Sequence, residues 1–148
     1  MPPPDVPWLD AVDVAVGEVA VPAEHTLAVR PWSRPHGPAD PLAVRLLLLT
    51  TPLPDDVDPA GLPGAAEELA RWRRRVGEWA RLPSAAPPVD AVASVTAAVD
   101  DGLDTARALG LLRDLEVDGS VPAGARMEAF LALDRLLGLD LALGLVAR

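Results

Sequence analysis

Proline-rich breaks interrupt a chain whose apolar residues recur at helical spacing, and this pattern limits the fold to several short helices. The 148 residues include 17 prolines. The breaks lie at residues 31–41, 52–64 and 83–88. Between them, apolar residues return every three or four positions, as on one face of an α-helix. Because a helix interior tolerates proline poorly, each break separates one helix from the next.

Five helices are predicted between residues 39 and 148. Asp40 is expected to cap the first, with Pro41 at its first position. This helix is apolar nearly all round and is therefore expected to be buried on all sides. The second helix runs from about residue 65 to residue 82. The expected apolar faces of the second to fifth helices are Leu69, Trp72, Val76 and Trp79; Val92, Val95 or Thr96, and Val99; Ala108, Leu109, Leu112 and Leu115; and Met127, Phe130, Leu131 and Leu137.

Capping residues indicate where two of these helices begin or end. Asp104 can cap the fourth helix, and Gly138 can end the fifth in a left-handed conformation. The apolar residues that follow, 139–148, are expected to pack back on the bundle. We predict a mainly α fold, a helical bundle of about five helices in one domain over residues 39–148.

The N-terminal segment, residues 1–38, is rich in proline and shows no helical period. "VDVAV" and "EVAV" alternate apolar with polar or small residues, as half-buried strands do, and "HTLAVRPW" could be a third strand. We predict a short β-rich or irregular segment. The start of the chain lacks the features of a signal peptide, so a cytoplasmic protein is expected. The longest apolar run, "PLAVRLLLL", is too short to cross a bilayer, and no membrane partner is expected.

Composition argues against several classes of site. All 13 basic residues are arginine, and the chain has no lysine and no cysteine. Thiolate metal sites and thiol nucleophiles are therefore excluded. The net charge of −9 opposes binding to phosphate backbones, so a nucleic-acid partner is not expected. No phosphate-binding loop is visible, and no cofactor is expected.

Four stretches stand in an order typical of one enzyme family. They are "DPLAVRLLLLTTPL", "LARWRRRV", "AAVDDGLDTARALGLL" and "FLALDRLLGLDLA". Together they resemble the C-terminal helical part of cysteinyl-tRNA synthetases and of the related actinobacterial ligase that joins cysteine to glucosaminyl-inositol in mycothiol synthesis. The resemblance covers roughly residues 39–143. It implies that the helix of Asp40, Pro41 and Arg45 follows a catalytic domain, and that Asp100, Asp101 and Asp104 form an acidic turn before the last helix.

The resemblance does not extend to the family's chemistry. Its catalytic domain carries a nucleotide-binding motif, a lysine-containing loop and a zinc site with cysteine. Residues 1–38 are too few to hold such a domain, and no catalytic residue can be carried over. We therefore expect a non-catalytic, stand-alone helical module derived from a cysteinyl-tRNA synthetase-like ligase. It would act through protein–protein contact, with self-association as the simplest outcome. The alternative is a subunit or accessory of a split cysteine-activating ligase or aminoacyl-tRNA synthetase.

Charged residues supply the candidate sites. Arg71, Arg74 and Arg75 are the only basic cluster and could form a patch for phosphate or for a partner protein. They also stand three or four positions from Glu67, Glu68 and Glu78, a spacing typical of surface ion pairs on a helix.

Structural roles are expected for a second set of charges. Arg45 lies in the most apolar helix, so we expect it to meet a carboxylate of the segment that contains Asp100 and Asp101, or to reach an edge of the bundle. Asp100, Asp101 and Asp104 are expected to form a helix end and the cap that follows it.

Metal ligands are poorly arranged in this sequence. His25 and His36 are the only histidines, and their spacing, with Glu24 or Asp40 as a third ligand, matches no known motif. The acidic loop of Asp55, Asp56 and Asp58 lacks the spacing and the glycine of a calcium loop. No metal is expected.

The charge pattern generates a first prediction. The isolated protein should bind neither ATP nor tRNA, because it lacks a phosphate cradle and its one arginine cluster is flanked by acids. The measurement is a titration of labelled bulk tRNA, and separately of ATP, at about 50 mM salt, where phosphate contacts are strongest. Saturable tRNA binding below about 1 μM, lost on added salt and on changing the three arginines of the cluster to alanine, would contradict it.

Overall fold

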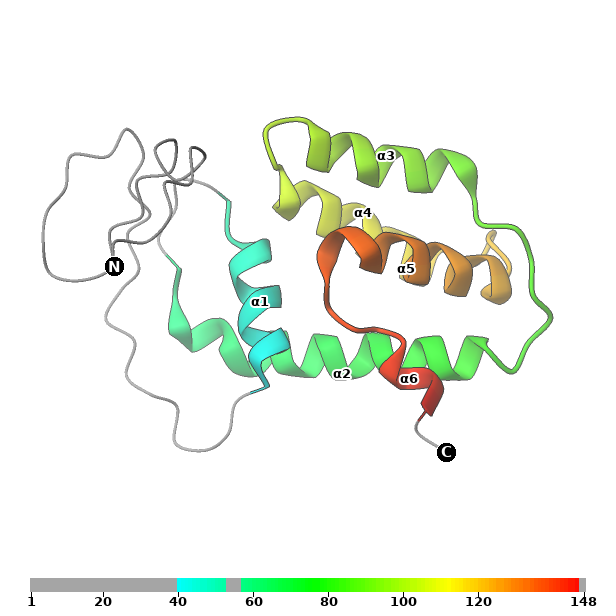
Figure 1. The fold of residues 1–148 in the computed structure, drawn as a ribbon, viewed down its shortest axis with the longest axis horizontal. Coiled ribbons are helices and arrows are strands. Elements are labelled where there is room, and N and C mark those ends of the chain that lie inside the picture. The colour runs from blue at the N-terminus through cyan, green and yellow to red at the C-terminus, as the bar shows by residue number, and fades with distance from the viewer. Residues whose placement is uncertain (1–39, 53–56, 147–148) are drawn as a thin grey trace, which may run out of the picture.

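Six α-helices form a bundle in the computed structural model, which describes residues 40–52 and 57–146 (Figure 1). Within these ranges the structure has no strand, so the predicted mainly α fold is confirmed. The strands expected in residues 1–38 lie outside the described residues. The elements are α1 (Pro41–Thr50), the 3-10 turn η2 (Pro59–Gly61), α2 (Leu62–Trp79), α3 (Val89–Asp100), α4 (Thr105–Val117), α5 (Ala123–Leu137) and α6 (Leu143–Val146).

Aspartate caps begin three of these elements. The Leu42 amide donates to Asp40 Oδ1 at 2.9 Å, and Pro41 stands in the first turn of α1, as the sequence predicts. The Arg107 amide donates to Asp104 Oδ1 at 3.0 Å and confirms the predicted cap of α4. Asp58 caps η2 in the same way. Each carboxylate satisfies an amide that has no partner inside its own helix.

The second helix is displaced from its predicted bounds by three residues at each end. It begins at Leu62, because η2 leads directly into it, and ends at Trp79 instead of residue 82. The early end has a steric cause, since Pro83 disfavours a helical conformation at Leu82. The predicted apolar stripe is confirmed, and its four residues are 5% exposed or less: Leu69, Trp72, Val76 and Trp79.

The helices are arranged so that α2 and α3 lie at opposite edges of the bundle. Figure 1 shows α3 along the upper edge, α2 along the lower edge and α5 between them. α1 packs on α2 and α4, while α3 packs on α4 and α5. The outer surfaces of α2 and α3 therefore lie on opposite sides of the bundle.

Aromatic rings fill the centre of the bundle. Trp72 and Phe130 are fully buried, with ring centroids 5.8 Å apart and an edge-to-face geometry. Trp79 meets the same Phe130 ring at 5.2 Å. Such pairs contribute beyond the area they bury. The predicted face of α4 joins this core, with Ala108, Leu109, Leu112 and Leu115 all buried.

One face of α1 stays outside the core, contrary to the expectation of a helix buried on all sides. Ala43, Leu46 and Leu47 are buried, whereas Leu48 is 42% exposed and Arg45 is also exposed. A run of four leucines covers more than half of a helix circumference, and α2 and α4 pack on only part of it. No helix in the described ranges is long and apolar enough to cross a membrane.

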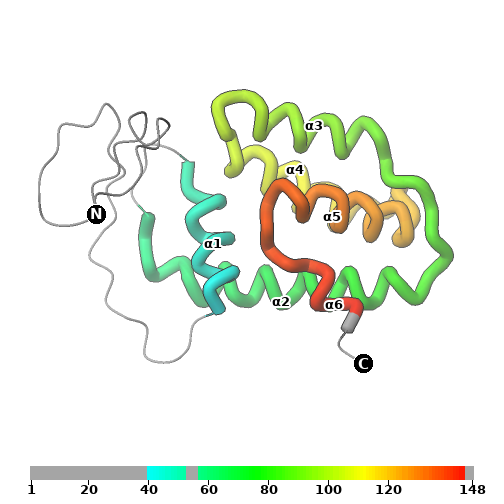
Figure 2. The backbone as a smooth tube through the Cα atoms, viewed as in Figure 1, coloured from blue at the N-terminus to red at the C-terminus, as the bar shows by residue number. Residues whose placement is uncertain are grey.

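The segment after α5 packs back on the bundle, as predicted. Gly138 has a φ of 63° and ends α5 in the left-handed conformation that glycine adopts readily. Leu139 and Leu141 are fully buried. Figure 2 shows the chain turning back after α5, and the short helix α6 lies against α2.

Two glycines bring the backbones of α2 and α6 into direct contact. A Cβ atom added to Gly144 would overlap the carbonyl group of Arg73, and one added to Gly77 would overlap the carbonyl oxygen of Gly144. Only glycine permits this approach. The position of α6 is therefore fixed by backbone contact.

This contact generates a second prediction. Gly144→Ala should lower the free energy of unfolding by about 1–3 kcal/mol, because α6 must move away from α2. The measurement is urea unfolding followed by circular dichroism.

Gly110→Ala is the matched control. An added Cβ there has no neighbouring atom within 4 Å, and the residue lies inside α4. This change should raise stability by up to about 1 kcal/mol, because alanine favours a helix. Equal effects of the two substitutions would contradict the close contact.

Candidate functional site

The arginine-rich stretch of α2 distributes its side chains around the whole helix. Trp72 points into the core, and its neighbours turn by about 100° for each residue. Arg71 and Arg75 approach Glu116 of α4. Arg73 reaches the segment before α6, and Arg74 lies exposed in a groove beside α6 itself. The three arginines of the predicted patch, Arg71, Arg74 and Arg75, share one side of α2 by helical spacing. Arg71 and Arg75 turn toward Glu116, whereas Arg74 lines the groove beside α6.

Glu116 is the buried acid around which part of this stretch gathers. It is 7% exposed. Arg71 donates two hydrogen bonds to its carboxylate, from Nε at 2.9 Å and from Nη2 at 3.1 Å. The indole Nε1 of Trp72 donates a third at 2.9 Å, and Arg75 Nε lies 4.0 Å away. A buried carboxylate with this set of donors joins α4 to α2.

Two of the helical pairs expected from spacing are present, but they are secondary. Arg71 bridges to Glu68 at 3.3 Å and Arg75 to Glu78 at 3.3 Å. Glu68 has a better partner in Arg113 of α4, which donates from Nε at 2.8 Å and from Nη2 at 2.9 Å. The stronger contacts join residues about 45 positions apart, which helical spacing does not reveal.

The ionisation of Glu116 follows from these contacts. Burial raises the pKa of Glu116, but hydrogen bonds from Arg71 and Trp72 and the charges of Arg71 and Arg75 lower it, and the net shift is downward. The Glu116 and Glu68 carboxylates in turn raise the pKa values of Arg71 and Arg113. Glu116, Arg71 and Arg113 are thereby held in their charged forms. The cluster is thus an ion-pair network that stabilises the contact between α2 and α4.

Arg45 binds a helix end. Its Nε donates to the carbonyl oxygen of Leu137 at 2.6 Å, at the C-terminus of α5. No ion pair of Arg45 with an acid is found in residues 40–52 and 57–146, so the expected partner in the Asp100 segment is wrong. Reaching an edge of the bundle is the expectation that holds, since Arg45 is exposed. A positive charge at this end also suits the helix dipole.

The acidic turn of Asp100, Asp101 and Asp104 has the expected form of a helix end followed by a helix cap. Asp100 is the last residue of α3, Asp101 caps that end, and Asp104 begins α4. Gly102 and Leu103 between them have φ values of 64° and 62°. The turn thus reverses the chain within four residues.

The metal-ligand candidates fall mostly outside the described part of the chain. Glu24, His25, His36, Asp55 and Asp56 all lie there. In the ranges that the structure does describe, no three acids or histidines gather as a metal site would require.

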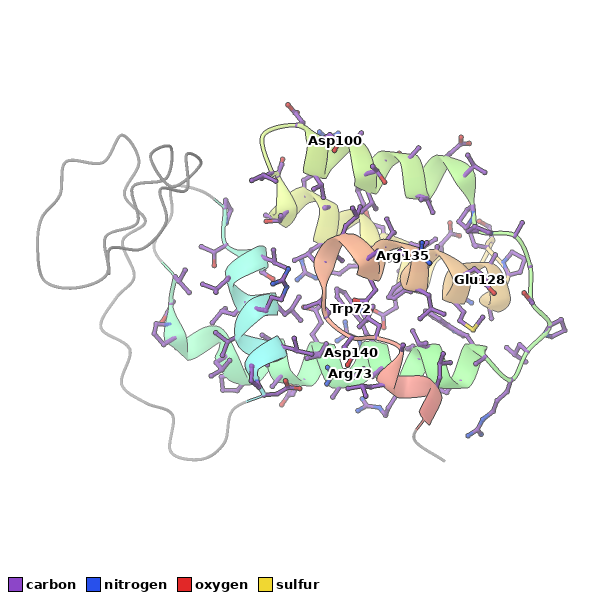
Figure 3. The ribbon with its side chains drawn as sticks, viewed as in Figure 1. Trp72, Arg73, Asp100, Glu128, Arg135 and Asp140 are labelled. Carbon is purple, nitrogen blue, oxygen red and sulfur yellow. The ribbon has the colours of Figure 1, made fainter. Side chains whose placement is uncertain are left out.

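Arg73 fastens the segment before α6. Its guanidinium donates to the carbonyl oxygens of Leu139 at 3.0 Å and Asp140 at 3.2 Å (Figure 3), and to Asp40 Oδ2 at 2.9 Å. A backbone hydrogen bond from Leu42 and the contact with Arg73 lower the pKa of Asp40. From the other side, Asp134 accepts hydrogen bonds from the amides of Leu139 and Leu141, both at 2.8 Å.

A groove of about 670 Å³ opens between α2 and α6. On its α2 side lie three arginines, Arg73, Arg74 and Arg81, and one acid, Glu78. Two leucines of α6 lie on the other side, and they are 46% and 40% exposed: Leu143 and Leu145. Neither this groove nor Arg81 was predicted, because both depend on where α6 lies.

Comparisons with known proteins give no relative. No protein-family model matches the chain, and no curated protein and no solved structure matches it.

The ion-pair network generates a third prediction. Because the pKa of Glu116 is lowered on folding, its contribution to stability is present above its ordinary value of 4.5 and is lost as pH falls through the lower folded value. Glu116→Gln should cost about 1–3 kcal/mol near neutral pH, since charged hydrogen bonds are lost in a buried place. The cost should shrink as pH falls below 4.5. The measurement is urea unfolding at a series of pH values.

Glu67→Gln is the control for this experiment, because Glu67 is an exposed acid of α2, the helix that Glu116 joins to α4. It should change stability little at any pH. A Glu116→Gln variant as stable as the wild type at neutral pH would show that the network does not stabilise the fold.

Proposed function

We propose that this bundle is a non-catalytic module that acts by contacting another protein, and that the groove between α2 and α6 is its contact surface. The observation that carries the proposal is the composition of that groove. Arginine and exposed leucine side chains stand together there. Arginine is enriched at protein interfaces, and the buried core of an interface is more apolar than the rest of the surface.

Two of the arginines are available for such a contact. Arg74 and Arg81 are exposed, and neither guanidinium has a hydrogen-bond or ion-pair partner among residues 40–52 and 57–146. Arg73 is already bound to Asp40 and to two carbonyl groups, and its side chain is 17% exposed. It therefore supplies positive charge to the floor of the groove, while Arg74 and Arg81 can reach a partner.

The rigidity of the groove favours the same function. The backbone contact of Gly77 with Gly144 fixes one wall against the other. A preformed surface loses little conformational entropy on binding. The proposed origin from a cysteinyl-tRNA synthetase-like ligase rests on the sequence resemblance alone.

A cross-linking experiment in the producing cell tests this function. A benzophenone amino acid at position 145 should give a discrete cross-linked product on illumination, because Leu145 lines the groove. The product should disappear when Arg74 and Arg81 are changed to glutamate in the same chain. Ala66, an exposed residue of α2 outside the groove, is the control position and should give none. A product from neither position, or the same products from both, would contradict the proposal.

A further inference from the structure

A second groove, of about 360 Å³, lies between α3 and α4 and has the opposite charge. It is lined by three acids, Asp90, Asp114 and Asp118, together with small and apolar residues, and no basic residue from the described part of the chain lines it. Next to it in the sequence stand two of the most exposed apolar side chains, Val89 at 76% and Val117 at 77%.

The three acids of this second groove lack ion-pair partners in the described part of the chain, although hydrogen bonds from Ser120 and the charge of Arg126 lower the pKa of Asp118. No ion pair of Asp90, Asp114 or Asp118 is found within residues 40–52 and 57–146. The sequence of α3 contains no basic residue. Arg113 of α4 is next to Asp114 in the chain, but its guanidinium is bound to Glu68.

The two grooves complement each other in charge and in apolar character. The groove between α2 and α6 combines three arginines and one acid with exposed leucines. The groove between α3 and α4 combines three acids with neighbouring exposed valines. Opposed patches of this kind steer association and fix the register of two partners.

One molecule cannot join its own two grooves. Figure 1 places α3 and α2 at opposite edges of the bundle, with α5 between them, so the grooves belong to different sides. A second copy of this chain carries the matching groove and is present wherever the first copy is present.

We propose that the groove between α2 and α6 binds the α3–α4 groove of a second copy, an inference that rests on the proposed function and names its partner. The two surfaces differ, so the contact is head-to-tail and leaves one groove open at each end of a dimer. Association therefore continues beyond the dimer as concentration rises, into an open chain or a closed ring.

Salt dependence alone does not test this contact. The net charge of −9 makes whole molecules repel one another, and added salt weakens that repulsion together with the local attraction. Reversal of charge at named positions separates the two effects.

The experiment uses three variants of the full chain in sedimentation equilibrium at concentrations up to about 1 mM, the range of weak association. The groove variant carries Arg74→Glu and Arg81→Glu, and the face variant carries Asp90→Arg and Asp114→Arg. The third variant carries all four changes. All four residues are exposed. Circular dichroism and thermal melting establish that each variant folds.

The wild type should self-associate past a dimer. Each two-residue variant should associate about tenfold or more weakly, because like charges then face each other. If general charge repulsion controlled association, the groove variant, which is more acidic than the wild type, would associate more weakly. The face variant, which is less acidic, would associate more strongly. The four-residue variant has the wild-type net charge and should regain association, because its reversed surfaces again match.

A wild type that stays monomeric overturns the inference, and so does a folded four-residue variant that stays dissociated. Association that neither two-residue variant weakens overturns it as well, because another surface then forms the contact. A monomeric wild type that still gives a cross-linked product from position 145 leaves the proposed function standing with a different protein as partner. No product from that position removes the proposed function itself.

Discussion

The contact between the backbones of α2 and α6 is the constraint on which the functional surface depends. Gly77 and Gly144 allow two helices to approach without intervening side chains. The approach fixes α6, and α6 supplies one side of the groove that holds Arg74 and Arg81. A helix of four residues has little stability of its own, so its position must come from tertiary contacts.

Polar groups on both sides of the preceding turn hold α6 in place. Asp134 accepts hydrogen bonds from two amides of this turn, and Arg73 donates to two of its carbonyl groups. Arg45 binds the last carbonyl of α5 just before it. Buried backbone groups need such partners, and here side chains of α1, α2 and α5 provide them. The same charged residues could be mistaken for a binding site, although their hydrogen bonds are already used within the fold.

Local chemistry explains why much of the fold is readable from the sequence. The cap at Asp40, the cap at Asp104 and the left-handed Gly138 each depend on a few adjacent residues. The apolar stripe around Trp72 depends only on helical period. Both ends of α2 lie three residues before their predicted positions. η2 leads directly into its first turn, and Pro83 disfavours a helical conformation beyond its end.

The site was less predictable, because its contacts join distant parts of the chain. Glu116 binds Arg71 across 45 positions, and Arg45 binds Leu137 across 92. Spacing rules detect only the pairs within a helix, such as Arg75 with Glu78. The groove itself exists only once α6 lies on α2, so the sequence indicated an arginine cluster and not the surface that Arg74 and Arg81 share.

Amide hydrogen exchange at Leu139 and Leu141 tests most directly whether the segment between α5 and α6 is a docked part of the bundle. Both amides donate to Asp134, and both side chains are fully buried. We expect these two amides to exchange as slowly as those in the centre of α2, because exposing them requires the turn to leave the core. Exchange at the rate of a frayed chain end, while α2 remains protected, would contradict a docked α6 and with it the groove.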